Sequence, residues 1–239
     1  MKQTLMTHMV CGYPNLAESK KIFTVLSQYS KYIEVQFPFS DPIADGITIS
    51  EANTVALKNN ITTQKCFHFL EKHTKKSTAQ VLIMTYYNII LNYWVEAFIK
   101  EAKQKWIYGL IVPDILFDEP DGKILLLLCK KYDIHLIQTI SPSCDLKRLK
   151  DISKVASWFV YAISQNMTTW NKWKFWEEFR EYIKRVKQHI KIPLWIGFWI
   201  STKTDIKSVC KEWSFAIIGS KMIKIYNEKG WDWINDFLK

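Results

Sequence analysis

Apolar and polar positions follow two different periods along the 239-residue chain. Short apolar runs rich in β-branched and aromatic residues predict strands, and longer stretches with apolar residues every three or four positions predict helices. The predicted strands lie near residues 4–11, 32–37, 80–86, 108–112, 135–139, 158–163, 193–197 and 215–218. The predicted helices lie near residues 15–28, 50–58, 64–75, 95–105, 122–131, 146–155, 173–189, 204–212 and 231–238.

Strands and helices alternate without a break, which is the pattern of βα units in a parallel sheet. Eight such units in a chain of this length predict an α/β fold, a single (β/α)₈ TIM-barrel domain over residues 1–239. An open doubly wound sheet is the main alternative, and the absence of a GxGxxG turn weighs against it. Asp145, and Thr202 or Thr204, are predicted to cap the helices that follow them.

The segment from residue 32 to residue 46 joins the second predicted strand to a loop and carries Glu34, Asp41 and Asp45. A carboxylate inside an apolar strand is costly unless it is paired, hydrogen-bonded or used in chemistry. Asp45-Gly46 is a turn dipeptide that can direct Asp45 back toward the end of the strand. Two interpretations follow: an active-site acid pair, or a core ion pair with aspartates that cap the next helix.

Composition narrows the function classes. The formal charge of +10 comes from lysines in small groups on predicted helix faces, where water solvates them. Five cysteines and five histidines are scattered without metal-ligand spacing, so neither a metal site nor a disulfide framework is expected. We expect a cytoplasmic protein without a membrane segment. Glycine is scarce, at 7 residues, whereas tryptophan numbers 11.

Residues 37–46 read Phe-Pro-Phe-Ser-Asp-Pro-Ile-Ala-Asp-Gly, which resembles the PFSDPxADG signature of the tryptophan synthase alpha chain family. Shorter motifs continue the resemblance in order along the whole chain. They are Gly-Tyr-Pro at 12–14, Met-Thr-Tyr-Tyr-Asn at 84–88, Val-Pro-Asp at 112–114, Gly-Phe at 197–198 and Ile-Gly-Ser at 218–220. The family usually has an extra helix before the first strand, and we expect it to be missing here, leaving apolar surface at the bottom of the barrel or another segment covering it.

The resemblance implies a retro-aldol cleavage of indole-3-glycerol phosphate to indole and glyceraldehyde 3-phosphate. Glu34 would protonate the ring carbon and take up the proton of the substrate hydroxyl, while Asp45 would accept the indole N–H. By position, the indole pocket would be formed by His8, Met84, Tyr86, Ile111, Tyr161 and Phe198. His8 replaces a residue that is usually phenylalanine, and Gln36 one that is usually glycine.

On the phosphate side, the resemblance implies that Gly219, Ser220 and Thr169 bind the ligand. Three family glycines are replaced. The GFG motif reads Gly197-Phe198-Trp199, and the two glycines of the loop after the sixth strand read Met167 and Trp170. A side chain at such a position obstructs the close approach of backbone to an anion. We therefore expect weak or lost lyase activity, with a fully active lyase that has a remodelled phosphate site as the alternative.

The family also binds and activates a beta chain, which holds the pyridoxal phosphate, so the resemblance implies no cofactor in this chain. The implied partner is the tryptophan synthase beta chain in an α2β2 heterotetramer, contacted through Pro38, Asp41, Asn88 and Asn92. Activation of the beta chain then becomes the expected main role. The remaining alternative is a stand-alone binding protein, in which Trp170, Trp173 and Trp176 stack nucleic-acid bases, although spacing of three favours a packed helix face. We expect no nucleic-acid partner.

Overall fold

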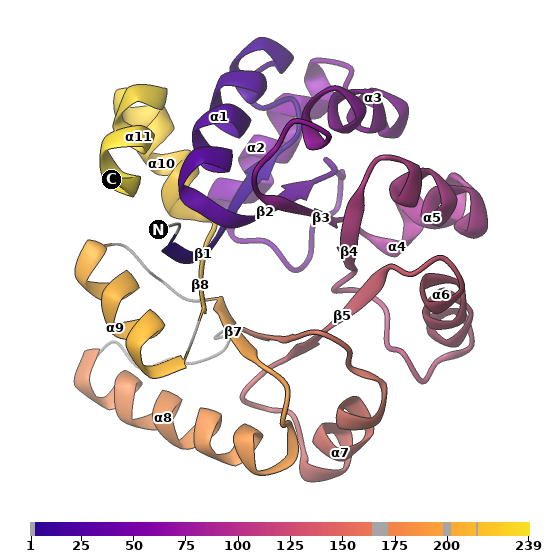
Figure 1. The fold of residues 1–239 in the computed structure, drawn as a ribbon, viewed down its shortest axis with the longest axis vertical. Helices are drawn as coiled ribbons and strands as arrows, with labels where there is room; N and C mark the ends of the chain where they lie inside the picture. Colours follow the sequence, from indigo (N-terminus) through magenta and orange to yellow (C-terminus); the bar gives the residue numbers. More distant parts are fainter. Residues whose placement is uncertain (1–2, 164–171, 198–201, 214) are drawn as a thin grey trace.

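A computed structural model describes residues 3–163, 172–197, 202–213 and 215–239. Its eight parallel strands form a closed barrel in which each strand pairs with its sequence neighbours and β8 pairs with β1 (Figure 1). The strands are β1 (Gln3–Val10), β2 (Ser30–Gln36), β3 (Gln80–Met84), β4 (Ile107–Ile111), β5 (His135–Ile140), β6 (Val160–Ile163), β7 (Leu194–Gly197) and β8 (Phe215–Ile218). The predicted TIM-barrel fold is confirmed.

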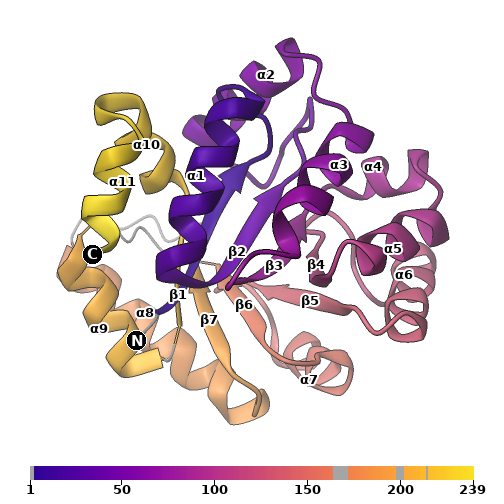
Figure 2. The same cartoon turned by 45° about the horizontal axis from the view of Figure 1, so that its top comes forward.

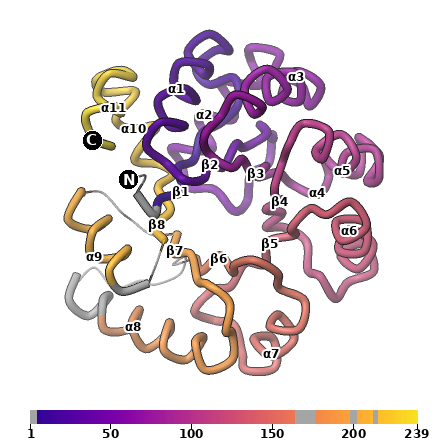
Figure 3. Tube along the Cα trace, viewed as in Figure 1, coloured from indigo at the N-terminus to yellow at the C-terminus, as the bar shows by residue number. Residues whose placement is uncertain are grey.

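Helices surround the strands (Figure 2). They are α1 (Leu16–Tyr29), α2 (Ile47–Lys58), α3 (Thr63–Thr74), α4 (Tyr87–Asn92), α5 (Val95–Gln104), α6 (Pro120–Lys131), α7 (Leu146–Val155), α8 (Lys172–His189), α9 (Lys203–Trp213), α10 (Ser220–Lys229) and α11 (Trp231–Leu238). The sequence prediction missed α4 and α10. The last helices, α10 and α11, lie beside α1 and so bring the end of the chain next to its beginning (Figure 3).

Side chains cap the N-termini of α7 and α9, as the sequence predicts. Asp145 Oδ1 accepts a hydrogen bond from the Arg148 N–H at 2.7 Å, which confirms the cap of α7. Thr202 Oγ1 accepts from the Asp205 N–H at 3.1 Å, and the Asp205 carboxylate accepts from the Thr202 N–H at 3.0 Å. This reciprocal pair satisfies backbone donors that the first turn of α9 leaves without helical partners.

Parallel register places the functional part of β2 beside β1. His8 lies opposite Glu34, and Val10 lies opposite Gln36. Because successive side chains of a strand point to opposite faces, Glu34 and Gln36 share the inner face of the barrel while Val35 packs outward beneath the helices. The second strand therefore delivers two polar side chains to the barrel interior.

Aromatic side chains fill the barrel at the N-terminal ends of the strands. We call this group the aromatic floor: Tyr32, Trp158, Phe159, Trp195 and Phe215. Trp195 stacks between Phe159, with ring centroids 3.5 Å apart, and Phe215, with centroids 4.5 Å apart. Tyr32 lies against the same indole at 4.3 Å. Side chains of the barrel itself therefore occupy its bottom.

Candidate functional site

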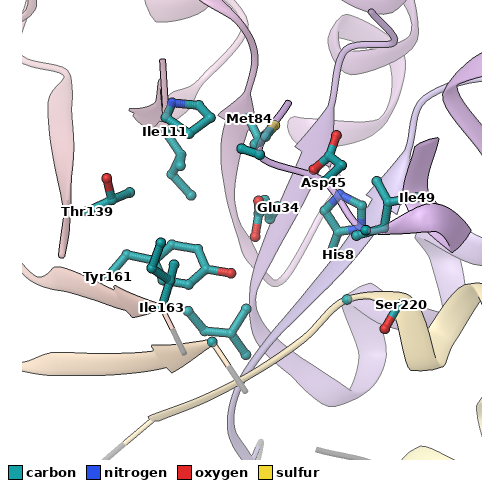
Figure 4. Close-up of a pocket in the computed structure, with 16 residues that line it drawn as sticks. His8, Glu34, Asp45, Ile49, Met84, Ile111, Thr139, Tyr161, Ile163 and Ser220 are labelled. Atoms are coloured by element: carbon teal, nitrogen blue, oxygen red, sulfur yellow. The ribbon is translucent and has the colours of Figure 1, made fainter. Parts of the chain in front are cut away.

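A cavity of about 310 Å³ opens at the C-terminal ends of the strands, opposite the aromatic floor (Figure 4). Catalytic side chains of TIM barrels stand at this end. Of the residues that the sequence singled out, the cavity is lined by Glu34, Asp45, Met84, Ile111, Tyr161, Gly219, Ser220 and His8. Residues from opposite ends of the sequence thus meet in one space.

Glu34 enters the cavity from β2 and is only 4% exposed. Among the described residues, its Oε2 has no hydrogen-bond partner and no ion pair includes Glu34. Burial, followed by the nearby charge of Asp45, raises the pKa of Glu34 to about 8. The carboxyl group is therefore protonated at neutral pH and available as an acid, and the core ion pair is not what the described residues form.

Asp45 ends the loop after β2 and turns its carboxylate back toward the strand, as the Asp-Gly turn predicts. Its Oδ2 accepts a hydrogen bond from Gln36 Nε2 at 2.6 Å and a longer one from Asn53 Nδ2 at 3.4 Å. Burial raises the pKa of Asp45, while hydrogen bonds from Gln36, Tyr86 and Asn53 oppose that rise. These donors favour the charged form of Asp45, whereas the surroundings of Glu34 favour its protonated form.

The walls of the cavity are apolar and aromatic. Met84 and Ile111 line one side, and the Tyr161 ring lies toward Glu34 (Figure 4). Gly197 makes room for that ring, because a Cβ at this position would lie 2.2 Å from Tyr161 Cε2. Burial and the neighbouring Glu34 raise the pKa of the Tyr161 hydroxyl well above its usual value. Flat apolar walls with few polar groups suit an aromatic ligand.

Tyr86 does not line the cavity. It is buried behind Asp45, where its hydroxyl accepts a hydrogen bond from the Ala44 N–H at 3.1 Å. Its ring stacks on Phe39 with centroids 5.0 Å apart. Tyr86 therefore supports the loop that carries Asp45. The sequence predicts a contact with substrate for this residue instead.

The polar end of the cavity is formed by Gly219 and Ser220, which begin α10. A helix N-terminus presents unpaired backbone N–H groups and a partial positive charge, both of which favour anions. The other predicted ligand contacts, Thr169 and Phe198, lie outside the described residues, as do Trp170 and Trp199. Their roles stay predictions.

The residues predicted to contact a partner differ in exposure. Asp41, Asn88 and Asn92 are exposed, whereas Pro38 is buried. Near them, the loop and first turn between β2 and α2 carry Ile43, 82% exposed, and Ile47, 79% exposed. Both side chains are therefore accessible to a partner at the end of the barrel where the cavity opens.

Sequence reasoning missed several site residues. Ile49, Thr139, Ile163 and Ile217 line the cavity but carry no chemical signal in the sequence. Asn53 is fully buried, accepting from the Phe39 N–H at 3.1 Å and donating to the Ile49 carbonyl at 2.9 Å. A single amide on the apolar face of a predicted helix is the signal that could have identified it.

In the part of the chain that the structure describes, no helix combines the length and apolar character needed to cross a bilayer. No group of three or more His, Cys, Asp or Glu side chains in that part is arranged to hold a metal ion.

Comparison with known proteins gives a consistent match. The family model described as tryptophan synthase alpha chain matches residues 1–236. The tryptophan synthase alpha chain of Petrotoga mobilis is 38% identical over 231 residues, covering 96% of this chain and 89% of the relative. That of Methanocaldococcus jannaschii is 39% identical over 217 residues, covering 90% and 76%.

Solved structures agree with the sequence relatives. The tryptophan synthase subunit alpha of Campylobacter jejuni superposes with a TM-score of 0.88 at 30% identity, covering 99% of this chain and 94% of that one. A chain of the tryptophan synthase complex from Pyrococcus furiosus gives a TM-score of 0.88 at 27% identity, covering 98% and 95%.

Proposed function

The chain belongs to the tryptophan synthase alpha chain family of tryptophan biosynthesis, and from that premise we propose that its cavity binds indole-3-glycerol phosphate and cleaves it by a retro-aldol reaction. The observation that carries this proposal is the pair of acids in one apolar cavity, Glu34 protonated and Asp45 surrounded by hydrogen-bond donors. The polar N-terminus of α10 would bind the phosphate.

The reaction returns each proton that it uses. Glu34 protonates carbon three of the indole ring, and the positive charge that forms on the ring nitrogen is stabilised by the Asp45 carboxylate. The Glu34 carboxylate then takes the proton of the substrate hydroxyl while the carbon–carbon bond breaks. The bonding electrons restore the indole ring, the hydroxyl carbon becomes the aldehyde, and Glu34 ends protonated.

A pKa of about 8 suits Glu34 to both steps. The group is protonated at neutral pH, when the first step needs an acid, and its conjugate base is strong enough to remove a hydroxyl proton as the bond breaks. Asp45 must hold a negative charge instead. Its hydrogen bonds from Gln36, Tyr86 and Asn53 favour that state.

The test is indole release from indole-3-glycerol phosphate by Glu34→Gln and Asp45→Asn variants. Loss of either acid should lower kcat by about 100-fold or more, because each contributes proton transfer or charge stabilisation. Glu51→Gln, an exposed carboxyl on α2, is the matched control and should leave kcat unchanged. Full activity in Glu34→Gln would overturn the assignment.

We also propose that this chain, with tryptophan at positions 170 and 199, binds the substrate phosphate weakly. Binding and activation of the beta chain would then be its main role. Both positions are glycine in the family motifs, and each backbone hydrogen bond lost to a charged ligand costs about 1.5 to 3 kcal/mol. Titration with a glycerol-phosphate analogue of indole tests this, with Trp199→Gly as the comparison. Tight binding by both proteins would favour the alternative, an active lyase with a remodelled phosphate site.

The partner surface has its own support. Exposed Asp41, Asn88 and Asn92 lie with exposed Ile43 on the face that would meet the beta chain. Ile43→Asp should therefore reduce stimulation of tryptophan formation by the beta chain from indole and serine. The control is Ile124→Asp on α6, where the side chain is 48% exposed. Equal stimulation by both variants would remove the support for this surface.

A further inference from the structure

His8 and Gln36, the two departures from the family pattern in the first two strands, are bonded to each other. His8 Nε2 lies 2.7 Å from Gln36 Oε1, and Gln36 Nε2 lies 2.6 Å from Asp45 Oδ2. Both side chains are buried, His8 at 3% exposure and Gln36 at 0%. The amide of Gln36, itself fully buried, therefore bridges the imidazole and the acid at the wall of the cavity.

The order of donors along this chain is fixed by chemistry. A carboxylate only accepts, so Asp45 must face the NH₂ group of Gln36, and the amide oxygen must then face His8. That oxygen also only accepts, so His8 must carry its proton on Nε2. Burial lowers the pKa of His8 to about 4, which keeps the ring neutral at the pH where the lyase would work.

We propose that Gln36 is a positioning residue for Asp45 and that His8 locks the Gln36 amide in the orientation that donates to the carboxylate. Without His8, rotation of the amide by half a turn would point its oxygen at Asp45 and replace an attraction by a repulsion. The role of Asp45 in catalysis rests on the proposed function, whereas the bonding of its carboxylate does not.

Carbon NMR of a labelled Asp45 carboxyl group measures the effect without depending on activity. Removing one hydrogen bond to a carboxylate should raise the titration midpoint of Asp45 by about one to two pH units in Gln36→Leu. His8→Phe should shift it in the same direction by less. The double variant should match Gln36→Leu alone, because His8 acts only through Gln36.

Activity adds a second measurement. The acid limb of the pH profile of kcat/KM should move upward with the Asp45 midpoint in Gln36→Leu, with kcat affected more than KM. An unchanged Asp45 midpoint, or additive shifts in the double variant, would overturn the positioning role. A shifted midpoint in a protein without any lyase activity would instead defeat the proposed function and leave the positioning role standing.

An independent observation concerns the backbone. Five non-glycine residues among those described have positive φ: Asn60 at 55°, Asp133 at 52°, Trp106 at 57°, Trp94 at 68° and Trp158 at 75°. Asparagine and aspartate are the usual non-glycine residues in this region, whereas a bulky residue there is an outlier. Tryptophan makes up only 11 of 239 residues, yet it occupies all three of the other positions.

Trp94 and Trp106 occupy the place just after a helix that glycine normally takes. Each follows the C-terminal cap of its helix, α4 or α5, and its N–H donates to a carbonyl of the last turn at 3.1 Å, as the Asn60 N–H does after α2 at 2.8 Å. For Trp94, ψ is 114°, outside the region that asparagine and aspartate share.

These two tryptophans pack little, although Lys75 Nζ lies 5.4 Å from the centroid of the Trp106 ring. The Trp94 side chain is 81% exposed and the Trp106 side chain 49% exposed.

Trp158 does pack, because its ring belongs to the aromatic floor and lies 5.2 Å from that of Tyr32. Its backbone nevertheless forms a tight γ-turn, in which the Phe159 N–H donates to the Ser157 carbonyl at 3.0 Å. A γ-turn with positive φ at its centre is rare and strained for a residue with a side chain.

We infer that the polypeptide made in the protein's own cells carries glycine at positions 94, 106 and 158, because one triplet that encodes them is read there as glycine. UGA is such a triplet, since different genetic codes read it as tryptophan, as glycine or as stop. The same reading at positions 170 and 199 would restore two family glycines and relieve the shortage of glycine in the chain. The weak phosphate binding proposed above would then apply only to a protein that carries tryptophan at positions 170 and 199.

Peptide mass spectrometry of the protein purified from its own cells decides the residue at each position. Peptides that span 94, 106 and 158 should have the mass of glycine, and tryptophan masses at these positions would overturn the inference. The gene should carry one shared triplet at these positions, different from the triplet for the packed Trp195.

Recombinant variants test the conformational argument separately. Trp94→Gly and Trp106→Gly should raise the midpoint of thermal unfolding, because glycine reaches their backbone angles without strain. Trp233→Gly is the matched control. Its side chain is 51% exposed, but it lies within α11, so glycine there should lower the midpoint. Lowered midpoints in all three variants would contradict the backbone argument.

Discussion

Replacing Glu34 by glutamine should make the protein more stable, by an amount that grows with pH. Burial raises the pKa of this carboxyl group from 4.5 to about 8. The folded protein therefore binds the proton more tightly than the unfolded chain does. Stability from this group is fully present below the unfolded pKa of 4.5 and is lost as pH rises through the folded pKa of about 8. Glutamine has the same shape and cannot ionise.

The size of the effect follows from the two pKa values. Each pKa unit corresponds to about 1.36 kcal/mol. The raised pKa of Glu34 therefore lowers the free energy of unfolding by about 1 kcal/mol at pH 5, about 3 kcal/mol at pH 7 and about 5 kcal/mol at pH 9. Relative to wild type, Glu34→Gln should therefore gain about 4 kcal/mol between pH 5 and pH 9. The side chain is only 4% exposed, so solvent screens little of this cost.

Urea unfolding of wild type and Glu34→Gln at pH 5, 7 and 9 measures the difference directly. Glu51→Gln serves as the control, because it removes an exposed carboxyl group on α2, and its stability curve should run parallel to that of wild type. A constant difference between Glu34→Gln and wild type from pH 5 to pH 9 would refute the claim that Glu34 is protonated in the folded cavity.

Three further substitutions test the packing around the site. Gly197→Ala should cost about 1 to 3 kcal/mol of unfolding free energy in urea, since its Cβ would lie 2.2 Å from Tyr161 Cε2; an unchanged midpoint would show that the ring moves freely. Asn53→Ala should cost about 1 to 3 kcal/mol through the lost partner of the Phe39 N–H, and thermal unfolding would show it. Asp145→Ala should cost about 1 kcal/mol as a lost cap, and a smaller loss with threonine there would support that cause.

The barrel could be predicted because each βα unit repeats the same local pattern, an apolar strand followed by an amphipathic helix. The helix α4 could not. It has six residues, too few to establish a helical period, and its first N–H is bound by the Asp114 carboxylate at 2.9 Å from a loop that follows β4. The helix α10 is not among the elements predicted from the apolar pattern, although the family resemblance places Gly219-Ser220 at a short helix after the eighth strand.

Within the site, residues that belong to a local sequence motif could be predicted. Hydrogen bonds between residues far apart in the sequence could not. The Asp-Gly turn and the acid in an apolar strand identify Asp45 and Glu34 as candidates. The bond from His8 to Gln36 depends on the register of β1 against β2, which no local pattern reports. Without that register, the sequence shows Gln36 only as a bulkier residue at a position that is usually glycine. In the structure it donates a hydrogen bond to Asp45 at 2.6 Å.

The aromatic floor closes one end of the barrel to small molecules and leaves the other end open. Trp195, stacked between Phe159 and Phe215, blocks passage along the barrel axis. Under the proposed reaction, an indole released above it would have to separate those rings to leave through the bottom. It would instead depart past the C-terminal ends of the strands, on the side of the loop after β2 and the helix α4. Residues at the far end of the barrel would thus set the direction in which the product leaves.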